Sequence, residues 1–81
     1  MDNRASRWRW KCRRGMKELD HVLDQFVTRN AAILDEAQAA LFETLLEMED
    51  DRLWSCLFRQ QSTQDKAMDS LIEQIRQSAR D

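Results

Sequence analysis

The chain lacks the residues that build tight β-hairpins. It contains no proline and only one glycine among its 81 residues, and no Asn-Gly or Asp-Gly pair occurs. Two-residue hairpin turns depend strongly on such pairs, whereas helices tolerate their absence. Apolar side chains make up 42% of the chain and charged ones 35%, which is enough apolar material for a folded core. We therefore predict an all-α fold.

Long apolar segments are also missing. No run approaches the roughly 20 apolar residues that a membrane-spanning helix needs, so no membrane span is expected. The first ten residues, MDNRASRWRW, contain no apolar stretch of the kind found in a secretory signal. These two absences predict a soluble, cytoplasmic protein.

Residues suited to catalysis or metal binding are scarce. The two cysteines, Cys12 and Cys56, are too few for a disulfide framework and have no metal-ligand spacing, so two reduced, partly buried thiols are expected. The single histidine, His21, falls on the polar side of a predicted helix. One glycine cannot form a dinucleotide-binding or phosphate-binding loop. We therefore expect no enzyme active site, no bound metal and no stably bound cofactor.

The length of the chain limits where a function can be located. A domain of 81 residues buries only about 60 to 65% of the surface that its unfolded chain exposes. Little room remains for an internal site, so a function performed on the outer surface is favoured. We predict a single domain over residues 1–81, a small compact five-helix bundle, with a basic N-terminal helix at 3–14 and a body at 16–80.

Hydrophobic periodicity defines the five helices. Apolar residues recur at three- and four-residue spacing over residues 3–14, 16–30, 35–47, 50–58 and 62–80. The expected N-terminal caps of the first, third, fourth and fifth helices are Asn3, Asp35, Asp50 or Asp51, and Ser62 or Thr63. Gly15 falls where a glycine just past the end of the first helix would stop it.

Charge is distributed unevenly along the chain. The first 17 residues hold seven bases and one acid, whereas the other 64 hold six bases and fourteen acids. In the segment RWRWKCRRG, bases alternate with tryptophans, a composition that suits nucleic acid or an anionic membrane surface. The same composition fits a docked first helix whose Trp8 faces the core and whose bases face water. The sequence leaves these alternatives open.

Two blocks of sequence resemble the SdhE family of bacterial flavinylation factors, whose mitochondrial relatives are called succinate dehydrogenase assembly factor 2. The first block is the motif R-G-x-x-E, formed by Arg14, Gly15 and Glu18, after a basic helix that contains tryptophan. The approach to this motif matches at Arg7, Trp10, Cys12 and Arg13, and the second block matches at Leu45, Leu46, Glu47, Asp50, Leu53 and Leu57. Two positions depart from the family pattern, because Asp51 replaces a frequent proline and Cys56 a frequent tryptophan.

The resemblance implies a helper and not a catalyst. Family members bind the flavoprotein subunit of succinate dehydrogenase, and in bacteria also that of fumarate reductase. They promote covalent attachment of FAD to a histidine of that subunit. We therefore expect an FAD assembly factor. The residues themselves predict that the chain holds no flavin of its own and is a monomer when free, since its apolar stripes are about what a five-helix core needs. The alternatives are a small nucleic-acid-binding protein with a basic arm, or an antitoxin-like interaction protein, as some family members have been described.

The resemblance also implies which residues bind the partner. The candidate partner-binding residues are Arg7, Trp10, Arg13, Arg14, Gly15, Glu18 and Asp50. Arg14 offers a planar fork of donors for a carboxylate, carbonyl groups or a phosphate. Gly15 permits a positive φ and close approach of another backbone. Glu18, expected in the first turn of the second helix, favours that helix start and can orient Arg14. The alternative is purely structural: a helix-ending glycine flanked by an ordinary ion pair.

Overall fold

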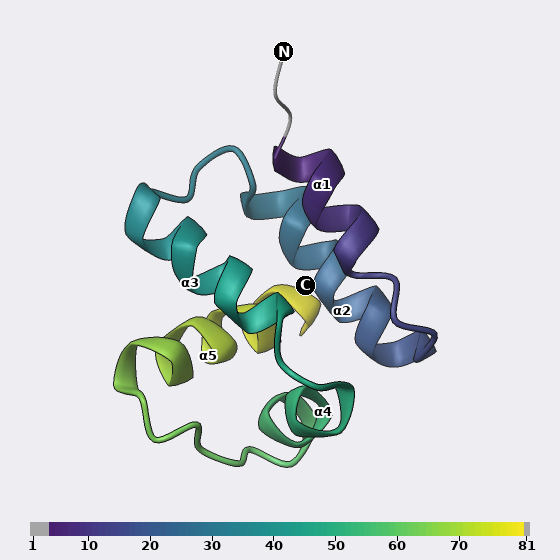
Figure 1. Cartoon of the computed structure of the whole chain (residues 1–81), viewed down its shortest axis with the longest axis vertical. Helices are drawn as coiled ribbons and strands as arrows, with labels where there is room; N and C mark the ends of the chain where they lie inside the picture. The colour runs from purple at the N-terminus through teal and green to yellow at the C-terminus, as the bar shows by residue number, and fades with distance from the viewer. Residues whose placement is uncertain (1–3, 81) are drawn as a thin grey trace.

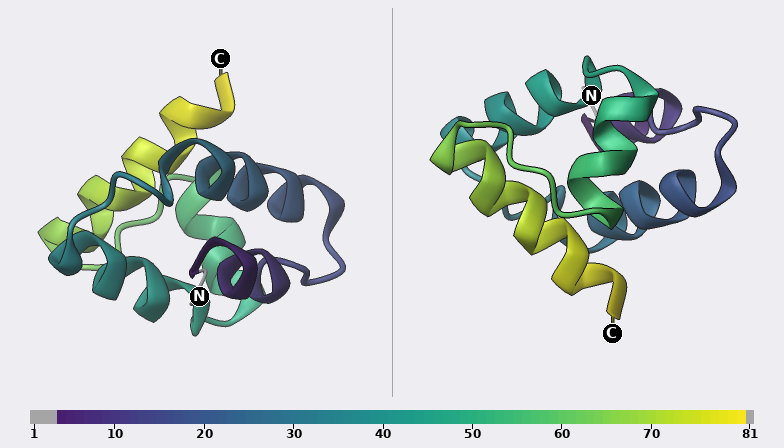
Figure 2. Two further views of the ribbon diagram at one scale, coloured as in Figure 1. Left: turned by 90° about the horizontal axis from the view of Figure 1, so that it is seen from above. Right: turned by 90° about the horizontal axis from the view of Figure 1, so that it is seen from below.

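The computed structural model describes residues 4–80, which form five helices and, within that range, no strand. The helices are α1 (Arg4–Lys11), α2 (Lys17–Asn30), α3 (Glu36–Leu46), α4 (Asp50–Phe58) and α5 (Lys66–Arg80). Helix α1 lies along α2, and α5 packs against α2, α3 and α4 (Figure 1, Figure 2). The all-α, five-helix prediction is confirmed. No helix in this range is both long enough and apolar enough to cross a membrane.

One hydrophobic core joins all five helices. Trp8 of α1 is 1% exposed, and its ring meets that of Phe42 edge-on at 4.8 Å between centroids. Phe26 of α2 contacts the same Phe42 ring at 5.1 Å. Both cysteines are buried as free thiols, as expected. The basic first helix is therefore docked on the body of the protein through its tryptophan.

Helix α1 ends earlier than predicted. Its last residue is Lys11, three residues before Arg14, so Gly15 lies in the connection to α2 and is not a helix-ending glycine. The N–H group of Arg13 already bonds three residues back, to the carbonyl of Trp10 at 3.3 Å, and the Asp20 carboxylate receives the next two N–H groups, those of Arg14 and Gly15, at 2.9 and 3.1 Å. Those N–H groups cannot then extend α1. The predicted cap at Asn3 lies outside the described residues.

The predicted helix starts at α3 and α4 had different outcomes. At α3, Asp35 caps the helix as expected, and its Oδ1 accepts the backbone N–H of Gln38 at 2.8 Å. At α4, Glu49 occupies the cap position and makes no side-chain cap bond, so the prediction of Asp50 or Asp51 is wrong. Asp50 is instead the first residue of the helix, and its carboxylate is bonded to an arginine described below.

Helix α5 begins at Lys66, later than the predicted start at Ser62 or Thr63. Asp65 is the capping residue, since its Oδ1 accepts the backbone N–H groups two and three residues further on, at 2.9 and 3.2 Å. Ser62 and Thr63 donate to the carboxylate of Asp69 instead. These hydrogen bonds, led by that of the Ser62 hydroxyl, hold the pKa of Asp69 below its ordinary value.

Arginine side chains cover the C-terminal ends of three helices. The only glycine of the chain is in the α1–α2 connection, and the left-handed position after α4 is taken by Gln60, with a φ of 56°. Arg4 donates to carbonyls at the end of α2, Arg14 at the end of α3 and Arg76 at the end of α4. The accepting carbonyls belong, in that order, to Ala31 and Leu34, Leu46 and Met48, and Leu57 and Cys56.

Candidate functional site

The R-G-x-x-E motif spans the connection between α1 and α2, at one edge of the molecule (Figure 1, Figure 2). Gly15 has a φ of 83°, the left-handed region that the sequence analysis allowed for. A Cβ atom built on Gly15 would have no atom within 4 Å other than those of Gly15 and its two chain neighbours. The glycine is also exposed. Within this protein, glycine is thus required at position 15 only for its positive φ, and the space beside the residue is open.

Asp20 fixes the backbone of this connection to the first turn of α2. Its two carboxylate oxygens each accept one N–H group, from Arg14 and from Gly15. Asp20 was not among the predicted site residues. The available signal was an acidic residue in the first turn of a helix just after a glycine, a position where a carboxylate commonly accepts backbone donors.

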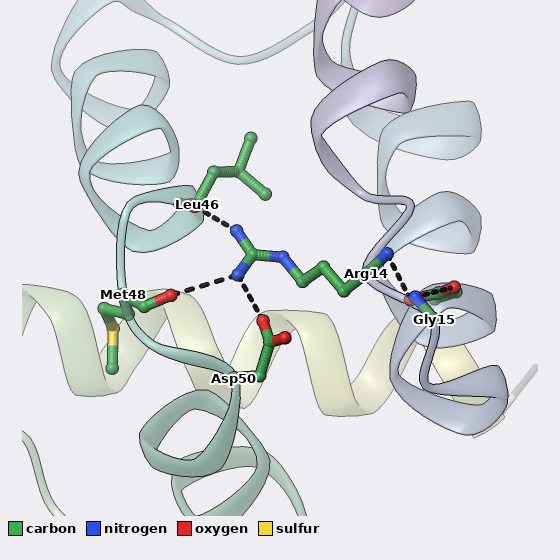
Figure 3. Close-up of polar contacts among 6 residues, drawn as sticks. Arg14, Gly15, Leu46, Met48 and Asp50 are labelled. Atoms are coloured by element: carbon green, nitrogen blue, oxygen red, sulfur yellow. Dashed lines mark hydrogen bonds and ion pairs between the residues drawn. The ribbon is translucent and has the colours of Figure 1, made fainter.

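The Arg14 side chain turns inward and joins the connection to the corner between α3 and α4 (Figure 3). Its Nη1 lies 3.0 Å from the carbonyl oxygen of Met48 and 2.8 Å from Oδ1 of Asp50, and its Nη2 donates to the carbonyl oxygen of Leu46. The side chain of Arg14 is only 11% exposed, and that of Asp50 is 42% exposed. The fork of donors is therefore occupied within this chain.

Glu18 lies in the first turn of α2, as expected, and is exposed. The expected contact with Arg14 is not formed, because in the part of the chain that the structure describes the Arg14 guanidinium bonds to the α3–α4 corner. Glu18 instead borders a largely apolar surface hollow of about 470 Å³ between α2, α4 and α5. The other residues that line it are Lys17, His21, Val22, Phe58 and Ala79.

The candidate residues of α1 divide into two groups. Trp10 is 72% exposed, and the guanidinium of Arg13 lies over its ring at 5.6 Å from the centroid. Arg7 is on the side of α1 that faces α3, where its Nη2 is 3.7 Å from Oε2 of Glu43. The structure thus pairs Trp10 with Arg13 and Arg14 with Asp50, and it places Arg7 beside Glu43.

The described residues offer few groups that take part in chemistry. Cys12 borders a hollow of about 440 Å³ beside α1 and α2, and burial raises the pKa of its thiol to about 12. A thiol with that pKa is protonated at neutral pH and is a poor nucleophile. His21 is exposed on α2. Among residues 4–80, no three His, Cys, Asp or Glu side chains are grouped so that they could hold a metal ion.

Fold and site together define a small all-helical protein whose distinctive residues surround one surface loop, an arrangement suited to binding another macromolecule. A family model described as "Flavinator of succinate dehydrogenase" matches residues 6–79. The chain belongs to this family, as its two sequence blocks predicted.

Individual relatives agree with the family match. The chain is 41% identical over 68 residues to a protein of Xylella fastidiosa named FAD assembly factor SdhE, covering 84% of this chain and 70% of the relative. It is 39% identical over 67 residues to the protein of that name from Methylococcus capsulatus, covering 83% and 81%. Against that of Legionella pneumophila the identity is 48% over 58 residues, covering 70% and 73%. No solved structure matches the chain significantly.

Proposed function

We propose that this protein is an FAD assembly factor. It binds the flavoprotein subunit of succinate dehydrogenase and promotes covalent attachment of FAD to a histidine of that subunit. The observation that carries the proposal is the match of the flavinator family over residues 6–79, which includes the whole R-G-x-x-E motif. The resemblance of its two sequence blocks to the bacterial flavinylation factors extends the proposal to the flavoprotein subunit of fumarate reductase.

The protein acts as a helper, and the chemistry takes place in its partner. Its thiol at Cys12 stays protonated, and its single histidine lies on the surface. What a small binding protein can supply is a fixed conformation of the partner in which histidine and flavin are aligned, and such alignment alone accelerates a reaction strongly. The helper needs no flavin of its own for this role and binds none stably.

The docking surface is centred on the α1–α2 connection. The open space beside Gly15 lets a backbone of the partner approach closely, and Glu18 offers a carboxylate to a cation or an N–H group on the partner. Trp10, with Arg13 over its ring, supplies the kind of exposed aromatic and arginine pair that dominates the energy of many interfaces. Arg7 forms the edge of this surface on the side of α3.

The nucleic-acid alternative loses support from the contacts of the basic segment. Arg4 and Arg14 donate to backbone carbonyls inside the fold. Arg7 is near Glu43, and Nε of Arg9 is 3.7 Å from Oδ1 of Asp24. These bases already have acceptors or acids beside them, so less positive charge remains for phosphates. An antitoxin role has no supporting contact, and location in the cytoplasm stays a prediction.

The test measures covalent FAD directly. A flavoprotein subunit of succinate dehydrogenase is produced with FAD in cells that lack their own assembly factor, with and without this protein, and flavin fluorescence is read after denaturing electrophoresis. We expect the fluorescence to increase with this protein. Glu18→Ala should reduce the increase, whereas Glu36→Ala, which removes an equally exposed acid from the first turn of α3, should not. Unchanged fluorescence with the wild-type chain would overturn the proposal.

A further inference from the structure

The loop that carries Gly15 is held from two sides by side chains that do not themselves lie in the open space beside it. On one side, the Asp20 carboxylate binds the backbone N–H groups of Arg14 and Gly15. On the other side, the Arg14 guanidinium reaches across to the α3–α4 corner and bonds to Asp50 and two carbonyls (Figure 3). These partners are 32 to 36 residues away in the chain. The conformation of this loop is therefore fixed by its hydrogen bonds to α2 and to the α3–α4 corner.

We propose that Arg14 and Asp50 are positioning residues of the docking surface. They fix the α1–α2 connection against the α3–α4 corner, so that Gly15 and Glu18 are presented to the flavoprotein in one geometry. This inference rests on the proposed function and assigns a different role to two of its candidate residues. Gly15 and Glu18, the exposed members of the motif, contact the partner. Arg14 acts by holding these two residues in place.

The geometry of Arg14 favours this role over direct contact. Its side chain is 11% exposed, and both terminal nitrogens already donate to acceptors within the chain. Its Nε is buried without a partner, so it is closed off from an incoming ligand as well. Turning the fork outward would leave the carbonyls of Leu46 and Met48 without this donor and would break the ion pair with Asp50, and an unpaired carbonyl is costly where it is screened from water.

A loosened loop would bind more weakly because fewer molecules would hold the competent conformation. The apparent dissociation constant equals the intrinsic constant divided by the competent fraction. A loop that is competent in one molecule in ten therefore weakens binding about tenfold, while saturating protein still restores full function. This pattern differs from the loss of a direct contact, which weakens binding without changing the free loop.

Two measurements on Arg14→Lys test the proposal. Lysine keeps the charge but has neither the planar fork nor its reach to several acceptors. The first measurement is the concentration of this protein that gives half-maximal covalent FAD in a reconstituted reaction with the purified flavoprotein subunit and free FAD. The second is hydrogen exchange of the Gly15 and Met16 amides in the free protein. We expect the half-maximal concentration to rise about tenfold, with an unchanged maximum, and exchange to accelerate in the loop but not in α5.

The matched control is Arg4→Lys. Arg4 covers the end of α2 in the way that Arg14 covers the end of α3, but it lies at the opposite end of α1 from the loop (Figure 1). It should lower the melting temperature while changing the half-maximal concentration less than twofold. A second variant, Asp50→Asn, removes the charge partner with little change of shape and should reproduce the loop effects in weaker form if Arg14→Lys does not fold.

Every possible result either supports or refutes the positioning role of Arg14 and Asp50. A normal half-maximal concentration for both Arg14→Lys and Asp50→Asn refutes the positioning role, and so does an equal defect in Arg4→Lys. Weakened binding with unchanged loop exchange shows that Arg14 contacts the partner directly, which also overturns the inference. Failure of the wild-type chain to raise covalent FAD refutes the proposed function, and that result is distinguishable because it does not involve any variant.

Discussion

Substitutions of Gly15 should separate the cost to stability from the loss of function. With a φ of 83° and no atom beyond its two chain neighbours within 4 Å of the Cβ position, a residue added at Gly15 meets strain in its backbone and no contact at its Cβ. That strain amounts to about 1 to 2 kcal/mol and is nearly the same for Gly15→Ala and Gly15→Arg. A domain with about 5 kcal/mol of stability would keep about 3 kcal/mol, so about 99% of the molecules stay folded.

The two variants nevertheless differ in the space that they fill beside the loop. If the flavoprotein backbone approaches there, Gly15→Ala should reduce covalent FAD partially, and Gly15→Arg should abolish it. Denaturant unfolding and in-gel flavin fluorescence are measured on the same preparations. Equal activity of the two variants, or a loss that only follows the unfolded fraction, would show that Gly15 is structural and that the docking surface is assigned wrongly.

A reciprocal substitution calibrates the backbone cost in this protein. Gln64 has a φ of 68° although it is not a glycine, and it lies in the connection before α5. Gln64→Gly should therefore relieve strain at a position far from the motif in sequence, with a gain no larger than about 1 kcal/mol after the added entropy of the unfolded chain. Covalent FAD should be unchanged in this variant. A loss of activity there would show that flavinylation responds to loop changes in general.

Four further results are expected. Phe26→Ala or Leu45→Ala, at positions 1% and 0% exposed, should lower stability by about 2 to 5 kcal/mol and reduce flavinylation only through unfolding, as melting curves beside FAD content would show. Glu18→Ala should cost no more than about 0.3 to 1 kcal/mol, yet it should weaken binding to the flavoprotein in a pull-down where Glu36→Ala does not. Because folding raises the pKa of the Cys12 thiol from 9.0 to about 12, this thiol ionises at lower pH in the unfolded chain than in the folded one. Its contribution to the free energy of unfolding should therefore be complete below pH 9 and decline as pH rises towards 12. Denaturant unfolding curves at a series of pH values measure this, and a midpoint that does not change with pH over that range would contradict it. The purified protein should be colourless above about 350 nm, because flavin absorbs there and none is expected to be bound. It should also elute from gel filtration as a monomer. A yellow chromophore that survives gel filtration would instead indicate a flavin carrier.

Local patterns in the sequence predicted the parts of the fold that depend on local interactions. The apolar periodicity identified all five helices, and Asp35 was correctly assigned as a cap because its partner is three residues away. Two errors have local causes: Asp20 lies five and six residues after the amides that it binds near the end of α1, and Asp65 caps α5 through the N–H groups two and three residues further on. The side chain of Asp50 is bonded to Arg14, 36 residues earlier. That pairing follows from the packing of the helices and cannot be read from spacing along the chain.

The candidate site shows the same division. Its surface members were predictable, because an exposed tryptophan, a glycine with positive φ and a carboxylate in a first turn are local properties. The inward direction of Arg14 was not, since the sequence shows a donor fork but not the carbonyls that it meets. Asp20 was overlooked because first-turn acids are common and most of them make no specific contact.

The arginines at the helix ends make three of the five helices depend on a segment outside them. The end of α2 is completed by Arg4 from α1, the end of α3 by Arg14 from the loop, and the end of α4 by Arg76 from α5. A fragment that contained α2, α3 or α4 alone would lack the donor for its last carbonyls, which lowers the stability of that helix in isolation. The basic N-terminal segment supplies two of the three donors. It is therefore a structural component of the cooperative folding unit and not an arm appended to a finished domain.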